Sequence, residues 1–144
     1  MDSIYDRDIL EWSETQAVLL RRLAESERAN DGAIDWENVI DEVESVGREQ
    51  LHAVESLLLQ AMLHALRAHA WPESPEVAHW QAEERLFRAQ ASNRFAPSMR
   101  QRIDVARLYR QALRALPDTI DGKAPLPVPD ACPVTLEELL ADVG

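Results

Sequence analysis

The sequence has little of several residue types, and each scarcity excludes a class of protein. A single cysteine, Cys132, excludes an internal disulfide and any zinc site built from several cysteines. Only 4 glycines, together with helical spacing of the apolar residues, argue against an all-β fold. No apolar run approaches the roughly 20 residues of a membrane-spanning helix, and the acidic N-terminus lacks the basic region of a signal peptide. We therefore expect a cytoplasmic protein that does not enter a membrane.

Basic residues are also scarce, and their distribution is uneven. The net charge is −11. Residues 1–60 carry 15 acids against 5 arginines, whereas residues 81–116 carry 8 arginines against 3 acids. The favoured interpretation is that acidic and basic helices pack together within one bundle. The alternative is an arginine surface for phosphate or nucleic acid, made by Arg100, Arg107, Arg110 and Arg114, but the acidic balance of the chain argues against nucleic acid.

The longest regular pattern runs from Asp35 to His69 and predicts one long amphipathic helix. Steps of three and four join its apolar positions, which is the period of a helix. Asp35 is placed to cap the start, and Pro72 marks the end. Gly47 is the expected position of a kink or break, a question that the pattern leaves open. Two polar residues, Gln50 and His64, interrupt the apolar stripe, which consists of Trp36, Val39, Val43, Val46, Val54, Leu57, Ala61 and Ala68.

Three further helices are expected around this one. The first covers residues 6–28, is capped by Asp6 or Asp8, and has an apolar stripe of Ile9, Trp12, Gln16, Leu19, Leu20 and Leu23. The next begins at the pair Ser74 and Pro75 and reaches about Asn93, and the last begins at Pro97 and reaches about Leu116. The spacing therefore predicts an all-α fold, bundle-like with four helices and a long central one.

The C-terminal part is expected to differ in character. Residues 117–134 hold five prolines, which forbid a helix and predict an extended arm. Residues 135–143 predict a short terminal helix in which Thr135 and Glu138 form a capping box. We therefore expect a single domain over residues 1–144, with the bundle in residues 1–116, the arm in 117–134 and the terminal helix in 135–143.

Two weak candidate sites emerge from the polar residues. An antiparallel hairpin places His64 near Glu84, and such a pair could act as a general base or as part of a metal site. The alternative, which we favour, is a structural hydrogen bond. Glu37, Asp41 and Glu44 share one helical face and could hold Mg²⁺. The alternative there is a solvated face with pairs such as Glu44–Arg48. The later helices offer no second acidic motif to complete a metal site.

Several separated blocks, found in order along the chain, resemble one protein family. The blocks are Tyr5-Asp6-Arg7-Asp8 with Trp12, the acidic run from Asp35 to Arg48, Leu63-His64-Ala65-Leu66 before Trp71, Trp80, and Ala131-Cys132-Pro133. Together they make the chain similar, over essentially its whole length, to the bacterial domain-of-unknown-function family twenty-nine. The resemblance implies an α-helical fold. It implies no activity, substrate or cofactor.

These observations favour a non-enzymatic protein–protein interaction module with a protein partner or a homo-oligomer. The central helix is too long to be covered at both ends, and an uncovered apolar stripe favours a partner helix. The alternative is a metal-dependent hydrolase that uses the acidic residues of the central helix. The sequence requires no cofactor and leaves open whether the protein is an enzyme.

Overall fold

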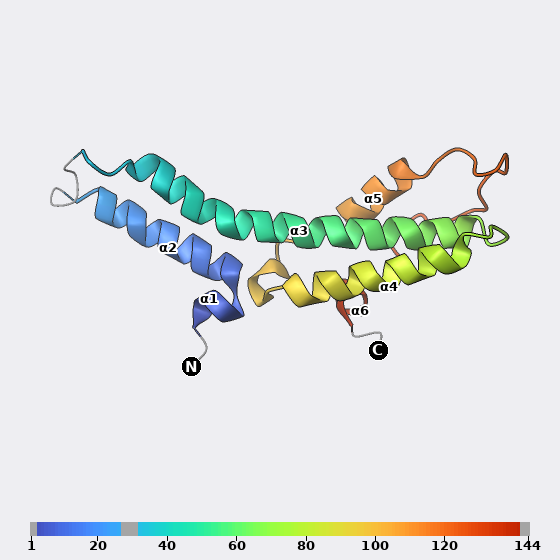
Figure 1. The fold of residues 1–144 in the computed structure, drawn as a ribbon, viewed down its shortest axis with the longest axis horizontal. Helices are drawn as coiled ribbons and strands as arrows, with labels where there is room; N and C mark the ends of the chain where they lie inside the picture. Colours follow the sequence, from blue (N-terminus) through green and yellow to red (C-terminus); the bar gives the residue numbers. More distant parts are fainter. Residues whose placement is uncertain (1–2, 27–31, 142–144) are drawn as a thin grey trace. The chain divides into compact units, whose positions relative to one another are not determined.

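The computed structural model describes residues 3–26 and 32–141 (Figure 1). No strand occurs in these ranges, which confirms the all-α fold, and a single antiparallel bridge joins Ile120 to Lys123. No helix in the described ranges is both long and apolar enough to cross a membrane. The helices are α1 (Ile4–Arg7), α2 (Ile9–Ala24), α3 (Trp36–Ala70), α4 (Val77–Arg94), α5 (Val105–Ala115) and α6 (Leu136–Leu140), and a 3-10 turn covers Pro97–Met99.

The chain forms two compact units. The first contains residues 1–52 and 96–102, and the second contains residues 53–95 and 103–144. Helix α3 contributes to both of them. That residues 1–144 act as a single domain stays a prediction.

The long central helix is present and unbroken. It has 35 residues and begins after Asp35, whose carboxylate accepts the backbone N–H of Asn38 at 3.3 Å. Gly47 lies inside the helix and does not interrupt it. The packing of α2 against this position gives a physical reason for a glycine here.

The segment predicted as the first helix is divided at Asp8. This residue caps α2, because its carboxylate accepts the N–H of Glu11 at 2.9 Å, and α1 ends just before it. The expected buried stripe was wrong in part. Leu19 and Leu23 are about half exposed, whereas Leu10, Ser13 and Ala17 are buried. The predicted end of this helix, residues 27 and 28, lies outside the described residues.

Two other helix starts differ from the prediction. Helix α4 begins at Val77 rather than Pro75, because the Ser74 hydroxyl accepts the N–H of Glu76 within a turn. The segment after Pro97 makes only a 3-10 turn, and α5 begins after Asp104, whose carboxylate accepts the N–H of Arg107 at 3.1 Å. A side-chain cap thus marks the start of α5, whereas the N-cap residue of α4, Glu76, makes no side-chain cap hydrogen bond.

In the second unit, the proline-rich arm contacts the C-terminal end of α3 and the middle of α5. The indole N–H of Trp71 donates to the carbonyl of Lys123 at 2.9 Å, and the hydroxyl of Tyr109 donates to the carbonyl of Pro129 at 2.6 Å. The capping box of α6 is present as predicted, and Leu136 and Leu139 of α6 are buried. The arm is thus held by hydrogen bonds to its backbone carbonyls and by the packing of Ile120 and Val128 against a buried cluster that contains Trp71.

Candidate functional site: the apolar face of the α2–α3 hairpin

The first unit is built on a close approach of α2 and α3. A Cβ atom added to Gly47 would lie 2.9 Å from the Cβ of Ser13 and 3.0 Å from the Cα of Leu10, so only glycine fits here. The Ser13 hydroxyl, fully buried, donates to the carbonyl of Val43 at 2.5 Å and accepts the N–H of Gly47 at 3.1 Å. Small residues therefore form the closest contact between the two helices, with Leu10 buried beside it, whereas Leu19 and Leu23 are left exposed at its edge.

One edge of this hairpin is closed by charge pairs. Arg21 of α2 pairs with Glu44 of α3, and Arg48 lies 3.9 Å from Glu44 and 3.7 Å from Asp41. About a third or more of each of these side chains is exposed to solvent. Solvent screening therefore limits the contribution of each ion pair to stability to about 0–1 kcal/mol. Their effect is mainly to make this edge polar.

The opposite edge is apolar. It consists of five side chains, which we call the apolar face: Trp12, Leu19 and Leu23 of α2, with Val39 and Val46 of α3. The four aliphatic members are between 38% and 49% exposed. The contact of Ser13 with Gly47 sets the register of the antiparallel pair, which places Leu19 opposite Val39 and Trp12 opposite Val46. Helical geometry puts all five on the side of the hairpin away from Arg21 and Arg48.

An aromatic pair extends the apolar face at one end. The ring of Tyr5, which is 52% exposed, meets the ring of Trp12 edge-on with centroids 4.8 Å apart. Exposed aromatic and aliphatic side chains gathered on one side are a common feature of protein-binding surfaces. Trp12 and Tyr5 are thus placed to provide the largest contact area at this end.

Asp8 holds the start of α2 in place. Its carboxylate accepts both the N–H and the hydroxyl of Ser98, each at 2.7 Å, as well as the cap bond from Glu11. Burial alone would raise the pKa of Asp8, but these hydrogen bonds to the ionised form outweigh it, and the pKa lies below the ordinary value of 3.8. Asp8 therefore stays charged and joins α2 to the turn that follows Pro97.

The predicted pair of His64 and Glu84 is not formed. The Nδ1 atom of His64 lies 2.7 Å from the carbonyl of Gln60, and its ring packs on Phe87. Glu84 instead lies 3.6 Å from Arg88, one helical turn away. Each polar side chain finds a partner on or near its own helix, so the expected hydrogen bond between the helices was wrong.

The three carboxylates proposed as metal ligands lie on the closed edge. Asp41 and Glu44 face Arg48, and the predicted Glu44–Arg48 pair is confirmed, whereas Glu37 is exposed in the first turn of α3. In residues 3–26 and 32–141, no three His, Cys, Asp or Glu side chains converge in a way that could hold a metal ion. The positive charge of the arginines beside these carboxylates disfavours a second cation there.

A hollow of about 330 Å³ in the second unit gathers polar residues that the sequence did not predict together. Glu84 pairs with Arg88, the Cys132 thiol donates to the carbonyl of Val134 at 3.3 Å, and Tyr109 donates to Pro129. Burial, with smaller contributions from Cys132 and Asp130, raises the pKa of Tyr109 above 10.0. The polar groups of Glu84, Tyr109 and Cys132 are already partnered within the protein, so they select no ligand. The hollow is lined by Ala61, Met62, Ala65, Leu66, His69, Glu84, Arg88, Tyr109, Pro129, Cys132, Pro133, Val134 and Leu139.

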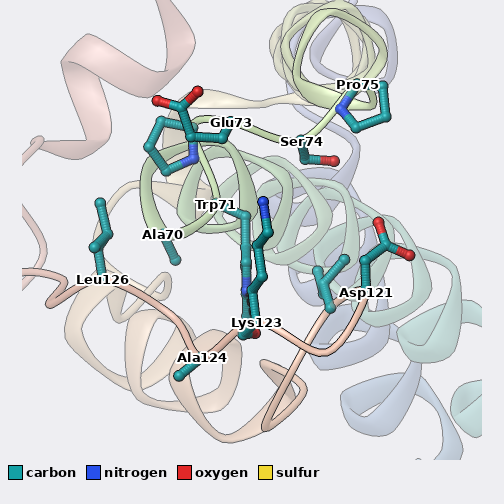
Figure 2. A pocket seen from close by; sticks show the side chains of 11 residues that line it. Ala70, Trp71, Glu73, Ser74, Pro75, Asp121, Lys123, Ala124 and Leu126 are labelled. Carbon is teal, nitrogen blue, oxygen red and sulfur yellow. Dashed lines mark hydrogen bonds between the residues drawn. The ribbon is translucent and has the colours of Figure 1, made fainter.

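A second hollow, of about 340 Å³, lies where the arm returns to the end of α3 (Figure 2). Figure 2 shows Trp71 beside Lys123, whose carbonyl accepts the indole N–H. A tight turn at Asp121 and Gly122, both with positive φ, brings the arm back to this point. The one polar atom of Trp71 is satisfied, so the arrangement is that of an anchor for the arm.

The parts of the first unit that sequence reasoning missed are its small residues. Ser13 and Ala17 are four residues apart on α2, and Gly47 faces Ser13 from α3. That spacing of small residues is the available signal for a close helix contact. The spacing of the small residues was not recognised, because the larger apolar residues of α2 form a regular helical stripe as well.

Comparisons with known proteins agree with this fold. The model of the family described as a domain of unknown function, DUF29, matches residues 4–143. A crystal structure of an α-helical protein of unknown function from Rhodospirillum rubrum superposes with a TM-score of 0.81 at 24% identity, covering 99% of this chain and 92% of that one. No curated protein matches the chain.

Proposed function

We propose that this chain, which belongs to the DUF29 family, is a non-enzymatic protein–protein interaction module. The binding surface is the apolar face of the α2–α3 hairpin. The observation that carries the proposal is the exposure of Leu19, Leu23, Val39 and Val46, each between 38% and 49%, on one side of a two-helix platform.

The platform resembles one side of a helix bundle from which a helix is missing. Two antiparallel helices with apolar side chains along one side offer a third helix the same ridges and grooves that hold helix bundles together. Leu19 and Val39 lie in the middle of this side, with Trp12 and Val46 at one end. Exposed aliphatic side chains have little effect on the stability of the free protein. They contribute strongly to the free energy of binding once a partner removes them from water.

Site-specific cross-linking in cells that produce the protein tests the proposal. A photoreactive phenylalanine analogue replaces Leu19, on the apolar face, or Val18, which is also exposed but lies on the closed edge of the same helix. The two probes have nearly the same exposure and neighbouring positions, so Val18 is a matched control. After illumination, adducts are separated by size on denaturing gels.

The proposal expects a discrete adduct from position 19 and none from position 18. Equal labelling from both positions would show that α2 meets its surroundings without a preferred side. An absence of adducts from position 19, in a variant that keeps the helical circular dichroism of the natural protein, would contradict an interaction through this face.

A further inference from the structure

We propose that the partner is a basic amphipathic helix of another protein, which lies along the apolar face with its basic flank over α3. This inference rests on the proposed function and names the chemistry of the partner. The observations behind it are the apolar face and the two carboxylates beside that face, those of Glu42 and Glu49.

Glu42 and Glu49 border the apolar face on the α3 side. Each follows a valine of the face by three residues, Val39 and Val46 respectively, which makes them neighbours on the helix surface. Both are exposed, and neither makes an ion pair or side-chain hydrogen bond among the described residues. Asp41 and Glu44 are different, because each of them forms an ion pair with an arginine on the closed edge.

The spacing of these acids suits a helix. Glu42 and Glu49 are seven residues apart, or about 10 Å along the axis, which is the repeat at which a packed helix returns to the same side. The α2 border is different, because Thr15 and Arg22 lie there. A partner with lysines or arginines at a seven-residue spacing on one flank therefore places them over α3, where charge is complementary.

A second copy of this chain fits the face less well. Its own α2–α3 hairpin would bring further carboxylates against Glu42 and Glu49, since residues 1–60 carry 15 acids and 5 arginines. The arginine-rich amphipathic helix α5 has Leu108, Tyr109 and Ala112 already buried, so its apolar side is occupied. Charge complementarity thus favours a different protein.

Three synthetic helical peptides of about 21 residues serve as probes. The first has leucine and isoleucine in a heptad stripe with lysines on one flank, and the second has glutamates in place of the lysines. The third has the composition of the first in scrambled order, so its apolar residues do not form a stripe. Binding of each to the full-length protein is measured by fluorescence anisotropy at several concentrations of NaCl.

Two double variants separate the apolar from the charged contribution. Leu19→Gln with Leu23→Gln removes apolar surface without a change of charge, and its control is Val18→Gln with Leu86→Gln at exposed apolar positions elsewhere. Glu42→Gln with Glu49→Gln removes the acidic row. Its control is Glu25→Gln with Glu37→Gln, which changes the net charge equally at exposed positions off the face.

The expected result is that the basic amphipathic peptide binds and the other two do not. Loss of Leu19 and Leu23 weakens its binding by about tenfold or more. Loss of Glu42 and Glu49 weakens it by about threefold to tenfold and reduces its dependence on salt. Both control variants bind as the natural protein does.

Other outcomes overturn the inference in distinguishable ways. Equal binding of the scrambled peptide would reveal attraction to an acidic protein and no docking of a helix. Suppose that the acidic peptide binds as tightly as the basic one, and that its binding is lost in the Leu19 and Leu23 double variant. That result would contradict a basic partner and would leave the proposed interaction through the apolar face intact. A stable dimer in sedimentation, dissociated by the Leu19 and Leu23 changes, would assign the face to a second copy.

Discussion

At Gly47, a hydrogen atom in place of a methyl group decides how closely α2 and α3 approach. The backbone of α2 at Leu10 and the side chain of Ser13 occupy the space that a Cβ would need. This proximity lets the Ser13 hydroxyl donate to the backbone carbonyl of Val43 in α3, and the carbonyl oxygen of Glu44 lies 3.0 Å from the same hydroxyl oxygen. The apolar face is a consequence, because a contact made by small residues leaves the bulky ones beside it.

Gly47→Ala should destabilise the protein although alanine favours helix. The gain in helix propensity is about 1 kcal/mol, whereas forcing a methyl group into a filled contact costs about 1–3 kcal/mol. Urea unfolding followed by circular dichroism measures the difference. Ser56→Ala, at an exposed position of α3, is the control and should leave stability equal or slightly higher. If Gly47→Ala unfolded at the same urea concentration as the natural protein, α2 would be able to move away from α3 with no loss in the free energy of unfolding.

Asp8→Ala should remove a cap and leave the N–H and hydroxyl of Ser98 without their acceptor. The expected loss in the free energy of unfolding at pH 7 is roughly 1–3 kcal/mol. Urea unfolding measures it, with Asp118→Ala, an exposed acid, as the control.

The same variant has a predictable pH dependence. The folded-state pKa of Asp8 lies below 3.8, so its stabilisation is complete above the pKa of the unfolded chain and is lost as pH falls through the folded value. The difference between natural protein and Asp8→Ala should therefore be constant from pH 7 to pH 5 and shrink below pH 4. A difference that grows on acidification would contradict the role of the charged carboxylate.

Helix α6 shows how an element of five residues is kept folded. A helix this short has no stability of its own in water. Its N-terminus is closed by the capping box of Thr135 and Glu138, and its last carbonyls are met by Arg88 of α4, which donates to Leu139 at 3.1 Å and also to Glu138. A cation at the C-terminal end is also favoured by the helix dipole.

Arg88→Leu should release α6 while α4 stays folded. The carbonyls of Glu138 and Leu139 lose their donor, and Glu84 loses its ion pair. Hydrogen exchange of the amides in Leu136–Leu140 should rise several-fold, with little change in Val77–Arg94. Arg85→Leu, an exposed arginine of the same helix, provides the comparison. Protection of α6 that survives in Arg88→Leu would show that Leu136 and Leu139 hold it without the arginine.

Over the whole molecule, a net charge of −11 opposes association through the apolar face. Like charge on two copies produces a repulsion that works against apolar contact between them. This repulsion vanishes near the isoelectric point, about pH 4.7. The same charge attracts a molecule of opposite sign, which is the kind of partner that we propose.

Light scattering between pH 8 and pH 4.7 should therefore show association that increases as the charge is lost. Leu19→Gln with Leu23→Gln should reduce this association, because it removes apolar surface without altering the charge. Val18→Gln with Leu86→Gln should associate as the natural protein does. If both double variants behaved alike, general loss of charge rather than this face would account for the association.

The sequence by itself determined the secondary structure where local chemistry decides it. Helical spacing, the Asp35 cap, the Thr135 capping box and the prolines of residues 117–134 each act over a few residues, and all are present as predicted. The blocks that resemble a family also identified it correctly. Asp8 was one of the two caps expected for the first helix and does cap α2, whereas the helix start at Asp104 was placed several residues too early, at Pro97.

Only the tertiary structure decided which side of each helix is buried. In α2 the stripe of Leu19 and Leu23 and the stripe of Ser13 and Ala17 are both compatible with a helix, and the sequence favours the more apolar one. Ser13 and Ala17 are the buried ones, because a close approach to Gly47 lets the Ser13 hydroxyl donate to the Val43 carbonyl and accept the Gly47 N–H within a tightly packed contact. Likewise, His64 and Glu84 took partners one turn away, which a hairpin register alone does not reveal. The candidate site exists because of that choice.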